Sequence, residues 1–432
     1  MSDESQPGSS PFGPGFDLSR LFGLLGSGGS GPVNWEVARE VADFTTTGEA
    51  TSTEEEPVAV DDARQFSDLA TAAQTAVVAE TGLSAALGTG TLVVGPRRWA
   101  RLHLDTLRPV LETLAATLTR DGFGIGSARS DEEGVGDDPA FDTDALDPEL
   151  AEQLGALGLP PDALNTGQLG EMLEMIAPAL LGVQAGSMIG HLATHAFGQY
   201  DLPLPVTGEP KLLFVVPNLD AFESDWSLPR DDLRFYVALH EVAHAATRSV
   251  PWVRSHLIEL ANEFVSGYRM DPDAMESVID ISGLDPTDPS TIGSALGDPE
   301  RLLDTMRTPA QGETLARLSD FTGVLEGYAD LVIESIGAPL IPSFAQIQEA
   351  MRRHRVERGE AERFIERLLG LGLNRADYER GESFCRGVVE RAGTDGLHRL
   401  WERPDRSPTR SELEAPGLWL ARIDLPDLDA PD

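Results

Sequence analysis

The sequence predicts a mainly α-helical protein with a minor β-sheet. Long segments place apolar residues three and four positions apart, which is the spacing of an amphipathic helix. The short apolar segment 211–219 has a different pattern: it is closed by Pro-Asn, as a strand would be. At 432 residues the chain can bury a large core, and it contains no internal repeat.

Helical periodicity extends along most of the chain, with turn signals between segments. The expected helices lie at about 33–43, 61–83, 97–122, 148–157, 169–197, 229–249, 252–268, 274–281, 299–306, 312–337, 343–371, 375–393 and 409–414, and the expected strands at 88–96 and 211–219. The helix expected at 229–249 has the clearest sequence signals at its two ends. Ser227 can cap its N-terminus, Pro229 suits its first turn, and Pro251 disfavours helix at the preceding residue.

Composition divides the chain into a body and appendages. Residues 1–60 begin with a stretch dense in Gly, Ser and Pro and continue into acidic sequence, so we expect a flexible tail there. Residues 125–147 are acidic and lack apolar periodicity, which predicts an exposed insertion. An acidic C-terminal tail follows at 421–432. The remaining residues, 61–420, are expected to form one helical domain.

The strong negative charge excludes some partners. The net charge is −39, and Lys211 is the only lysine, which argues against nucleic acid or an anionic membrane as a partner, because phosphate binding needs clustered Lys and Arg. Solvation, or adaptation to high salt, explains the acidity best, and an acidic docking surface stays open as an alternative.

The single cysteine, Cys385, excludes an intrachain disulfide and a cysteine-based zinc site. The chain begins without the basic and apolar regions of a signal peptide, and no window approaches 18 uninterrupted apolar residues. We therefore expect a soluble, cytoplasmic protein.

The motif His-Glu-Val-Ala-His at 240–244 predicts a metal centre. Residues four apart share one helix face, so His240 and His244 can direct both imidazoles at one ion, and two nitrogen ligands suit Zn²⁺. Glu241 lies about 100° around the helix, beside the metal, where a general base for water is needed. With eight histidines, such a motif arises by chance in only about 1% of comparable chains.

A hydrolytic zinc site needs a third protein ligand. Downstream, Glu326 and Asp330 lie four apart within the apolar segment FTGVLEGYADLVIESIG. A carboxylate on so apolar a helix needs a partner, and a cation is a good one. Spacing alone carries little weight in a chain with 72 acidic residues, so the two could also be a surface pair.

HEVAH followed by LEGYAD resembles the gluzincin arrangement. The resemblance implies that Glu326 is the third metal ligand and that Asp330 orients the first histidine, His240. With the segment GQYDLPLP at 198–205, these motifs resemble a zincin-like family of prokaryotic zinc-dependent metalloproteases of unestablished substrate. The similarity covers about 65–420. Some members carry a label linking them to biosynthesis of a deazaflavin coenzyme, and no residue here supports that chemistry.

Other side chains are candidates for supporting roles. Tyr328, two residues after Glu326, or His256 could donate a hydrogen bond to a developing oxyanion, although both could equally be packed helix residues. Arg248 and Arg254 are expected to form ion pairs rather than to take part in catalysis.

A second histidine pair, His191 and His195, also has a spacing of four but lacks an adjacent glutamate. Helix packing explains it, and an auxiliary metal or a role in the substrate cleft stays open. The sequence contains no nucleophile elbow, phosphate-binding loop or dinucleotide-binding fingerprint.

The resulting prediction is a Zn²⁺-dependent hydrolase in which Glu241 takes a proton from water, with a peptide as the first expected substrate. Two alternatives stay open: hydrolysis of a small, non-peptide amide, and a non-catalytic protein that keeps the metal for structure or for binding a partner. Retention of Glu241 argues against the second, because a structural site needs no general base.

Overall fold

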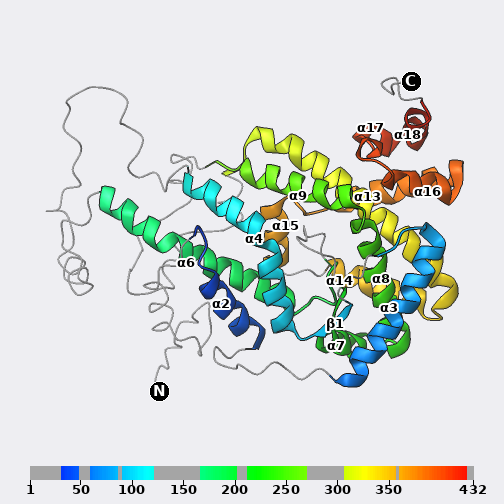
Figure 1. The fold of residues 1–432 in the computed structure, drawn as a ribbon, viewed down its shortest axis with the longest axis horizontal. Coiled ribbons are helices and arrows are strands. Elements are labelled where there is room, and N and C mark those ends of the chain that lie inside the picture. Colours follow the sequence, from blue (N-terminus) through cyan, green and yellow to red (C-terminus); the bar gives the residue numbers. More distant parts are fainter. Residues whose placement is uncertain are drawn as a thin grey trace, which may run out of the picture. The chain divides into compact units, whose positions relative to one another are not determined.

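The computed structural model describes residues 31–47, 59–85, 90–120, 166–201, 212–269, 306–356 and 360–425 (Figure 1). The predicted insertion 125–147 and the predicted helices 148–157 and 274–281 lie outside the described residues, as do residues 1–30 of the predicted N-terminal tail and 426–432 of the C-terminal one.

The chain forms two compact units. The first comprises residues 1–38, 111–184 and 267–308, and the second comprises 39–110, 185–266 and 309–432. Three helices contribute residues to both: α2 (Trp35–Thr47), α4 (Pro96–Arg120) and α6 (Thr166–Ala193).

In the first unit, the start of α2 is held by its own capping residue. The Asn34 side chain accepts a hydrogen bond from the backbone N–H of Val37, three residues into the turn, as an N-cap does. The Asn34 N–H donates to the carbonyl of Pro178 over 2.7 Å, and the Trp35 indole donates to Glu112 over 3.0 Å. This helix confirms the prediction at 33–43.

The second unit contains the remaining helices and the sheet. Its elements are α3 (Val60–Thr81), β1 (Thr91–Val94), β2 (Leu212–Val215), α7 (Val216–Trp226), α8 (Arg230–Arg248), α9 (Pro251–Ser266), α13 (Pro309–Leu340), α14 (Phe344–Val356), α15 (Glu360–Leu369), α16 (Arg375–His398), the short 3₁₀ turns Arg399–Trp401 and Pro404–Arg406, α17 (Arg410–Glu414) and α18 (Pro416–Ile423). Helices dominate the described residues, which confirms the predicted mainly α class.

The minor sheet consists of β1 and β2, at the two predicted strand positions. The strands are parallel, with Thr91 opposite Leu212 and Val94 opposite Val215. Parallel neighbours require a long crossover connection, and here α4 and α6 belong to it. Strand β2 is buried throughout, which explains why its sequence is continuously apolar. It ends at Val215, earlier than predicted, because the Val-Pro-Asn that follows begins α7.

Helix α8, which carries the His-Glu-x-x-His motif, lies in the core. It packs against α3 and α13, and nearly every residue from Leu233 to Arg248 is buried. Its N-terminus differs from the prediction. Ser227 does not cap α8; it adopts a left-handed conformation (φ 50°) that ends α7, and Pro229 occupies the N-cap position. The C-terminus agrees, since Pro251 begins α9.

Helices α13 and α16 approach closely because both carry glycine at the crossing. A β-carbon at Gly381 would lie 1.9 Å from the carbonyl oxygen of Gly323. This contact fixes the position of α13, the helix that carries Glu326. The prediction of a single helix at 343–371 was wrong, because this range contains two helices, α14 and α15.

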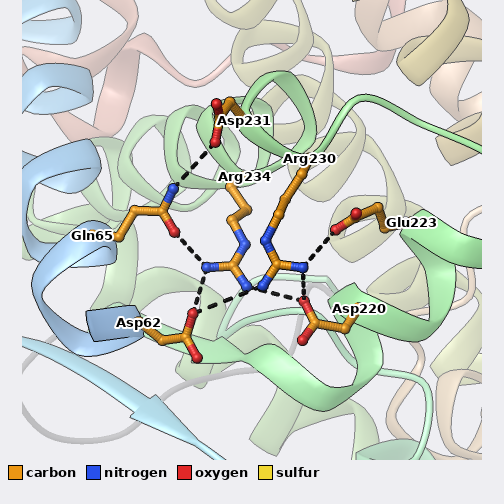
Figure 2. A network of polar contacts seen from close by, with 7 residues as sticks. All are labelled: Asp62, Gln65, Asp220, Glu223, Arg230, Asp231 and Arg234. Carbon is orange, nitrogen blue, oxygen red and sulfur yellow. Dashed lines mark hydrogen bonds and ion pairs between the residues drawn. The ribbon is translucent and has the colours of Figure 1, made fainter. Parts of the chain in front are cut away.

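A polar network fixes the first turns of α8 against α3 and α7 (Figure 2). The Arg234 side chain is only 1% exposed and pairs with Asp62 over 2.7 Å and with Asp220 over 3.0 Å. Arg230, one turn earlier and half-exposed, pairs with Asp220 and Glu223. The network ties α3 to α7 and α8, two consecutive helices that are distant from it in sequence.

Within the described residues, no helix combines the length and the hydrophobicity that crossing a lipid bilayer demands.

Candidate metal centre

The two histidines of α8 lie side by side, as their spacing predicts. The ring centroids of His240 and His244 are 4.4 Å apart, and both side chains are buried. Imidazoles removed from water need partners for their ring nitrogens, because a buried polar group without one costs free energy.

Glu326 reaches the same place from α13, which packs against α8. Its Oε1 atom lies 3.8 Å from Nδ1 of His244. The side chain is buried, and Oε1 makes no hydrogen bond within the part of the chain that the structure describes. The structure therefore brings Glu326 and His244 together, although 82 positions separate them in the sequence.

Glu241 occupies a closed cradle made of backbone. Its Oε2 accepts the N–H of Gln199 over 2.7 Å, and its Oε1 accepts the N–H of Tyr200 over 3.1 Å. Oε1 also lies 3.5 Å from Nδ1 of the neighbouring His240. Burial raises the pKa of the Glu241 carboxyl, while His240 and the Tyr200 N–H act in the opposite direction. A raised pKa favours a carboxylate that can accept and return a proton.

The cradle is held in turn by two aromatic residues of α4. The Trp99 indole donates to the carbonyl of Gly198 over 2.6 Å, and Nε2 of His103 lies 3.0 Å from the side-chain nitrogen of Gln199. Their rings stack, with centroids 3.5 Å apart. Trp99 and His103 therefore determine where the segment that binds Glu241 lies.

His103 is neutral in this arrangement. Burial lowers its pKa to about 4. Nδ1 lies 3.0 Å from the carbonyl of Trp99 and donates to it, which leaves Nε2 as the acceptor for the Gln199 amide. A single tautomer thus satisfies both contacts.

Asp201, His240 and Glu241 form a second possible set of metal ligands, which shares His240 with the set described above. Ligand atoms of Asp201, His240 and Glu241 lie within 4.8 Å of one another, the one such trio of His, Cys, Asp or Glu found in the described segments. Asp201 already accepts hydrogen bonds from the N–H groups of Phe197 and Gly198. Both carboxylates of the trio are therefore engaged with backbone.

Arg248, the last residue of α8, lies beside the centre. Its Nη1 is 2.8 Å from Nδ1 of His244, and its Nη2 is 3.5 Å from Oε1 of Glu326. The guanidinium also lies over the Tyr200 ring, 5.1 Å from its centroid. The ion pair agrees with the sequence-based expectation for Arg248, although its location beside two candidate ligands was not anticipated.

Two other predicted site residues lie on different sides of α13. Tyr328 is about 200° around the helix from Glu326, and its ring packs edge-on against Trp401 with centroids 5.0 Å apart. Asp330 lies near the buried Cys385, whose thiol pKa is raised first by burial and further by neighbouring carboxylates that include Asp330. The proposed pairing of Asp330 with the first histidine stays a prediction.

The remaining histidine candidates make ring contacts of their own. His256 packs edge-on against Phe321 with centroids 4.9 Å apart, and burial lowers its pKa. The ring centroids of His191, near the end of α6, and His195, in the turn that follows, are 5.0 Å apart. An auxiliary metal at this second pair stays a prediction.

Sequence reasoning missed the residues that surround Glu241. Gly198, Gln199 and Tyr200 belong to a segment noted only for its family resemblance, and they act through backbone N–H and C=O groups that carry no sequence signature. Trp99 and His103 offered one usable signal: two aromatic rings four residues apart on a helix can stack.

The chain matches the model of a known protein family and is similar in fold to a solved structure. Residues 33–420 match the model of a family described as zincin-like metallopeptidases. A search of curated proteins returned no match. Among solved structures, the chain is similar to a protein from Chloroflexus aurantiacus that carries a provisional hydrolase assignment and is described as having a novel fold. The two share 24% identity and a TM-score of 0.57, over 91% of this chain and 100% of that one, so the likeness concerns the fold.

Proposed function

This chain belongs to the zincin-like metallopeptidase family, and we propose that it is a zinc-dependent metallopeptidase in which His240, His244 and Glu326 hold the ion and Glu241 is the general base. The family and the hydrolase neighbour support hydrolysis as the class of reaction.

One observation carries the ligand assignment. The buried Oε1 of Glu326 makes no hydrogen bond to any described residue; it lies 3.8 Å from a ring nitrogen of His244 and 3.5 Å from the Arg248 guanidinium. A carboxylate oxygen removed from water without a donor is costly, and a divalent cation would offset that cost. Two imidazoles and one carboxylate are a typical ligand set for catalytic zinc, which leaves one position open. The chemistry of these three donors therefore fits Zn²⁺, and binding would draw them closer, because their ligand atoms do not all lie within 4.8 Å of one another.

The competing ligand trio fits less well. Asp201 and Glu241 already receive two backbone N–H donors each; those of Asp201 both reach Oδ2, whereas those of Glu241 occupy both oxygens, so a metal there would have to share the lone pairs of Glu241. Those same donors suit Glu241 to another role, because they hold the carboxylate in place without neutralising it. We therefore assign Glu326, and not Asp201, to the metal.

When bound, Zn²⁺ supplies a Lewis acid that polarises a carbonyl group and lowers the pKa of water toward about 7. Glu241 accepts a proton from the attacking water and delivers it to the amide nitrogen as the C–N bond breaks, so that one water and one amide become one acid and one amine. The N–H groups of Gln199 and Tyr200 keep the carboxylate aligned through both transfers.

Peptides are the first expected substrates because this is the activity for which the family is described. A small non-peptide amide would require the same ligands and base. A non-catalytic protein would not need a positioned proton acceptor such as Glu241.

The test is the variant Glu241→Gln, which keeps the size of the side chain and one of its two oxygen acceptors but cannot accept the proton. Zinc content, measured by elemental analysis, should stay at the wild-type level, while hydrolysis of a mixed library of peptides and small amides should fall by about 100-fold or more. Cleavage of small amides alone would identify the non-peptide alternative. Zinc-loaded wild-type protein that cleaves neither class would refute the proposal.

A further inference from the structure

Arg248 is a buried guanidinium with unused donors. The side chain is 3% exposed, yet its Nε and Nη2 atoms make no hydrogen bond in the described part of the chain. A guanidinium carries five N–H donors, and leaving them unpaired in a buried position is costly. Its two polar neighbours are His244, through Nη1, and Glu326, through an ion pair of 3.5 Å.

A bound metal ion would break both of these side-chain contacts of Arg248. A guanidinium only donates, so its contact with Nδ1 of His244 requires a lone pair there and places the imidazole hydrogen on Nε2. A metal bound at Nε2 needs the opposite tautomer, and a metal bound at Nδ1 takes the same lone pair. Coordination by either nitrogen therefore breaks the contact between Arg248 and the imidazole, leaving Nη1 its longer hydrogen bond of 3.5 Å to the His244 carbonyl, and coordination by Glu326 withdraws the counter-charge of Arg248.

We propose that the released Arg248 forms a carboxylate-binding subsite, which selects substrates that carry a free carboxylate next to the scissile amide. This inference rests on the proposed function, because the metal frees the guanidinium. A planar guanidinium binds a carboxylate through two parallel hydrogen bonds, and the two unused nitrogens, Nε and Nη2, form one such pair of donors.

The position of Arg248 limits the length of the substrate. Its guanidinium lies beside both proposed ligands, 2.8 Å from Nδ1 of His244 and 3.5 Å from Oε1 of Glu326, so a carboxylate bound there is separated from the reacting carbonyl by about one amino-acid residue. The Tyr200 ring packs against the guanidinium and helps to hold it. The substrates would be dipeptides, or peptides cleaved at their last bond.

The experiment measures binding separately from turnover. Zinc-loaded Glu241→Gln protein is titrated by calorimetry with a panel of N-acetyl dipeptides, each prepared as the free acid and as the C-terminal amide. We expect the acids to bind about tenfold tighter or more, because the amides lose the charge-assisted hydrogen bonds. Adding Arg248→Gln should bring acid and amide within about twofold of each other. Arg375→Gln, which removes a charge from a side chain that is 92% exposed, should keep the preference.

Equal binding of acids and amides by the protein with Arg248 intact, or a preference that survives Arg248→Gln, would overturn the subsite. The first comparison needs no change at position 248, so it decides the question even where Arg248→Gln does not fold. Hydrolysis of the same panel by wild-type protein reports on the proposed function. Cleavage without acid preference refutes the subsite alone, whereas acid-selective binding without cleavage supports the subsite and refutes the peptidase assignment.

Discussion

Gly198 lies against the carboxyl group of Glu241, at a distance that admits no side chain. A β-carbon at position 198 would stand 2.3 Å from Cδ of Glu241 and 2.4 Å from its Oε1. The absence of a side chain therefore lets the backbone of the next two residues reach the carboxylate and donate to it. Glycine at this position is a requirement of the proposed general base.

Gly198→Ala should disable catalysis without removing the metal. The added methyl group pushes the Glu241 carboxylate from its backbone donors, so we expect hydrolysis to fall by about 100-fold, the contribution of a positioned general base. Zinc content should not change. Gly312→Ala is the matched control, because a β-carbon at Gly312 meets nothing within 4 Å. Full activity of Gly198→Ala would show that the cradle does not matter for the reaction.

Glu326→Gln should weaken zinc binding by about 100-fold or more, since it replaces a charged ligand with a neutral amide. Asp201→Asn should retain zinc, because Asp201 accepts hydrogen bonds from the backbone N–H groups of Phe197 and Gly198 and is not a proposed ligand. Competition with a chromogenic chelator measures both affinities. The reverse order, with Asp201→Asn losing zinc and Glu326→Gln keeping it, would move the metal to the Asp201, His240 and Glu241 trio.

His103 should make the protein less stable in acid. Its pKa is about 4 in the folded chain against 6.5 as the ordinary value, so between these two pH values the unfolded chain binds a proton that the folded chain does not. Stability contributed by neutral His103 is complete above pH 6.5 and is lost as the pH falls, by about 2 kcal/mol between pH 7 and pH 5.

His103→Gln cannot titrate, so its Tm should decrease less than that of wild type when the pH is lowered from 7 to 5. His195→Gln, which changes an exposed histidine, serves as the control and should follow wild type. Parallel curves for His103→Gln and wild type would mean that His103 is not held neutral.

Arg234 should matter more for stability than Arg230, although both belong to the network of Figure 2. Arg234→Ala removes a side chain that is 1% exposed and leaves Asp62 and Asp220 with the half-exposed Arg230 as their ion-pair partner, at an expected cost of about 3 kcal/mol. Arg230→Ala removes a 46% exposed side chain whose ion pairs are screened by water, at less than about 1 kcal/mol. Urea unfolding compares the two, and equal effects would contradict a buried clamp.

Tyr328→Phe should leave catalysis nearly unchanged. The ring packs against Trp401 and points away from the helix face that carries Glu326, so its hydroxyl is remote from the reacting atoms. We expect kcat to change by less than about threefold, whereas loss of an oxyanion donor costs about 100-fold or more. A larger decrease with zinc retained would restore Tyr328 to the site.

Local periodicity predicted most of the described helices and both strands. The errors lie where a neighbouring element decides the boundary. Ser227 has the composition of a helix cap, yet it ends α7, and the Val-Pro-Asn after β2 begins a helix where the pattern indicated the end of a strand. One helix predicted at 343–371 is two. Helix ends depend on where the chain must turn next, which short-range spacing does not report.

The sequence by itself determined that His240, Glu241 and His244 share one helix turn, because the α-helical repeat makes neighbours of residues four apart. The tertiary structure decided which distant groups surround them. The approach of α13 brings Glu326 to His244, and the 198–200 segment reaches Glu241 through backbone N–H groups alone. Arg248 acquired its contact with Glu326, and His103 its contact with Gln199, in the same way. Such contacts depend on the packing of elements far apart in the chain, and a single sequence carries no spacing that encodes them.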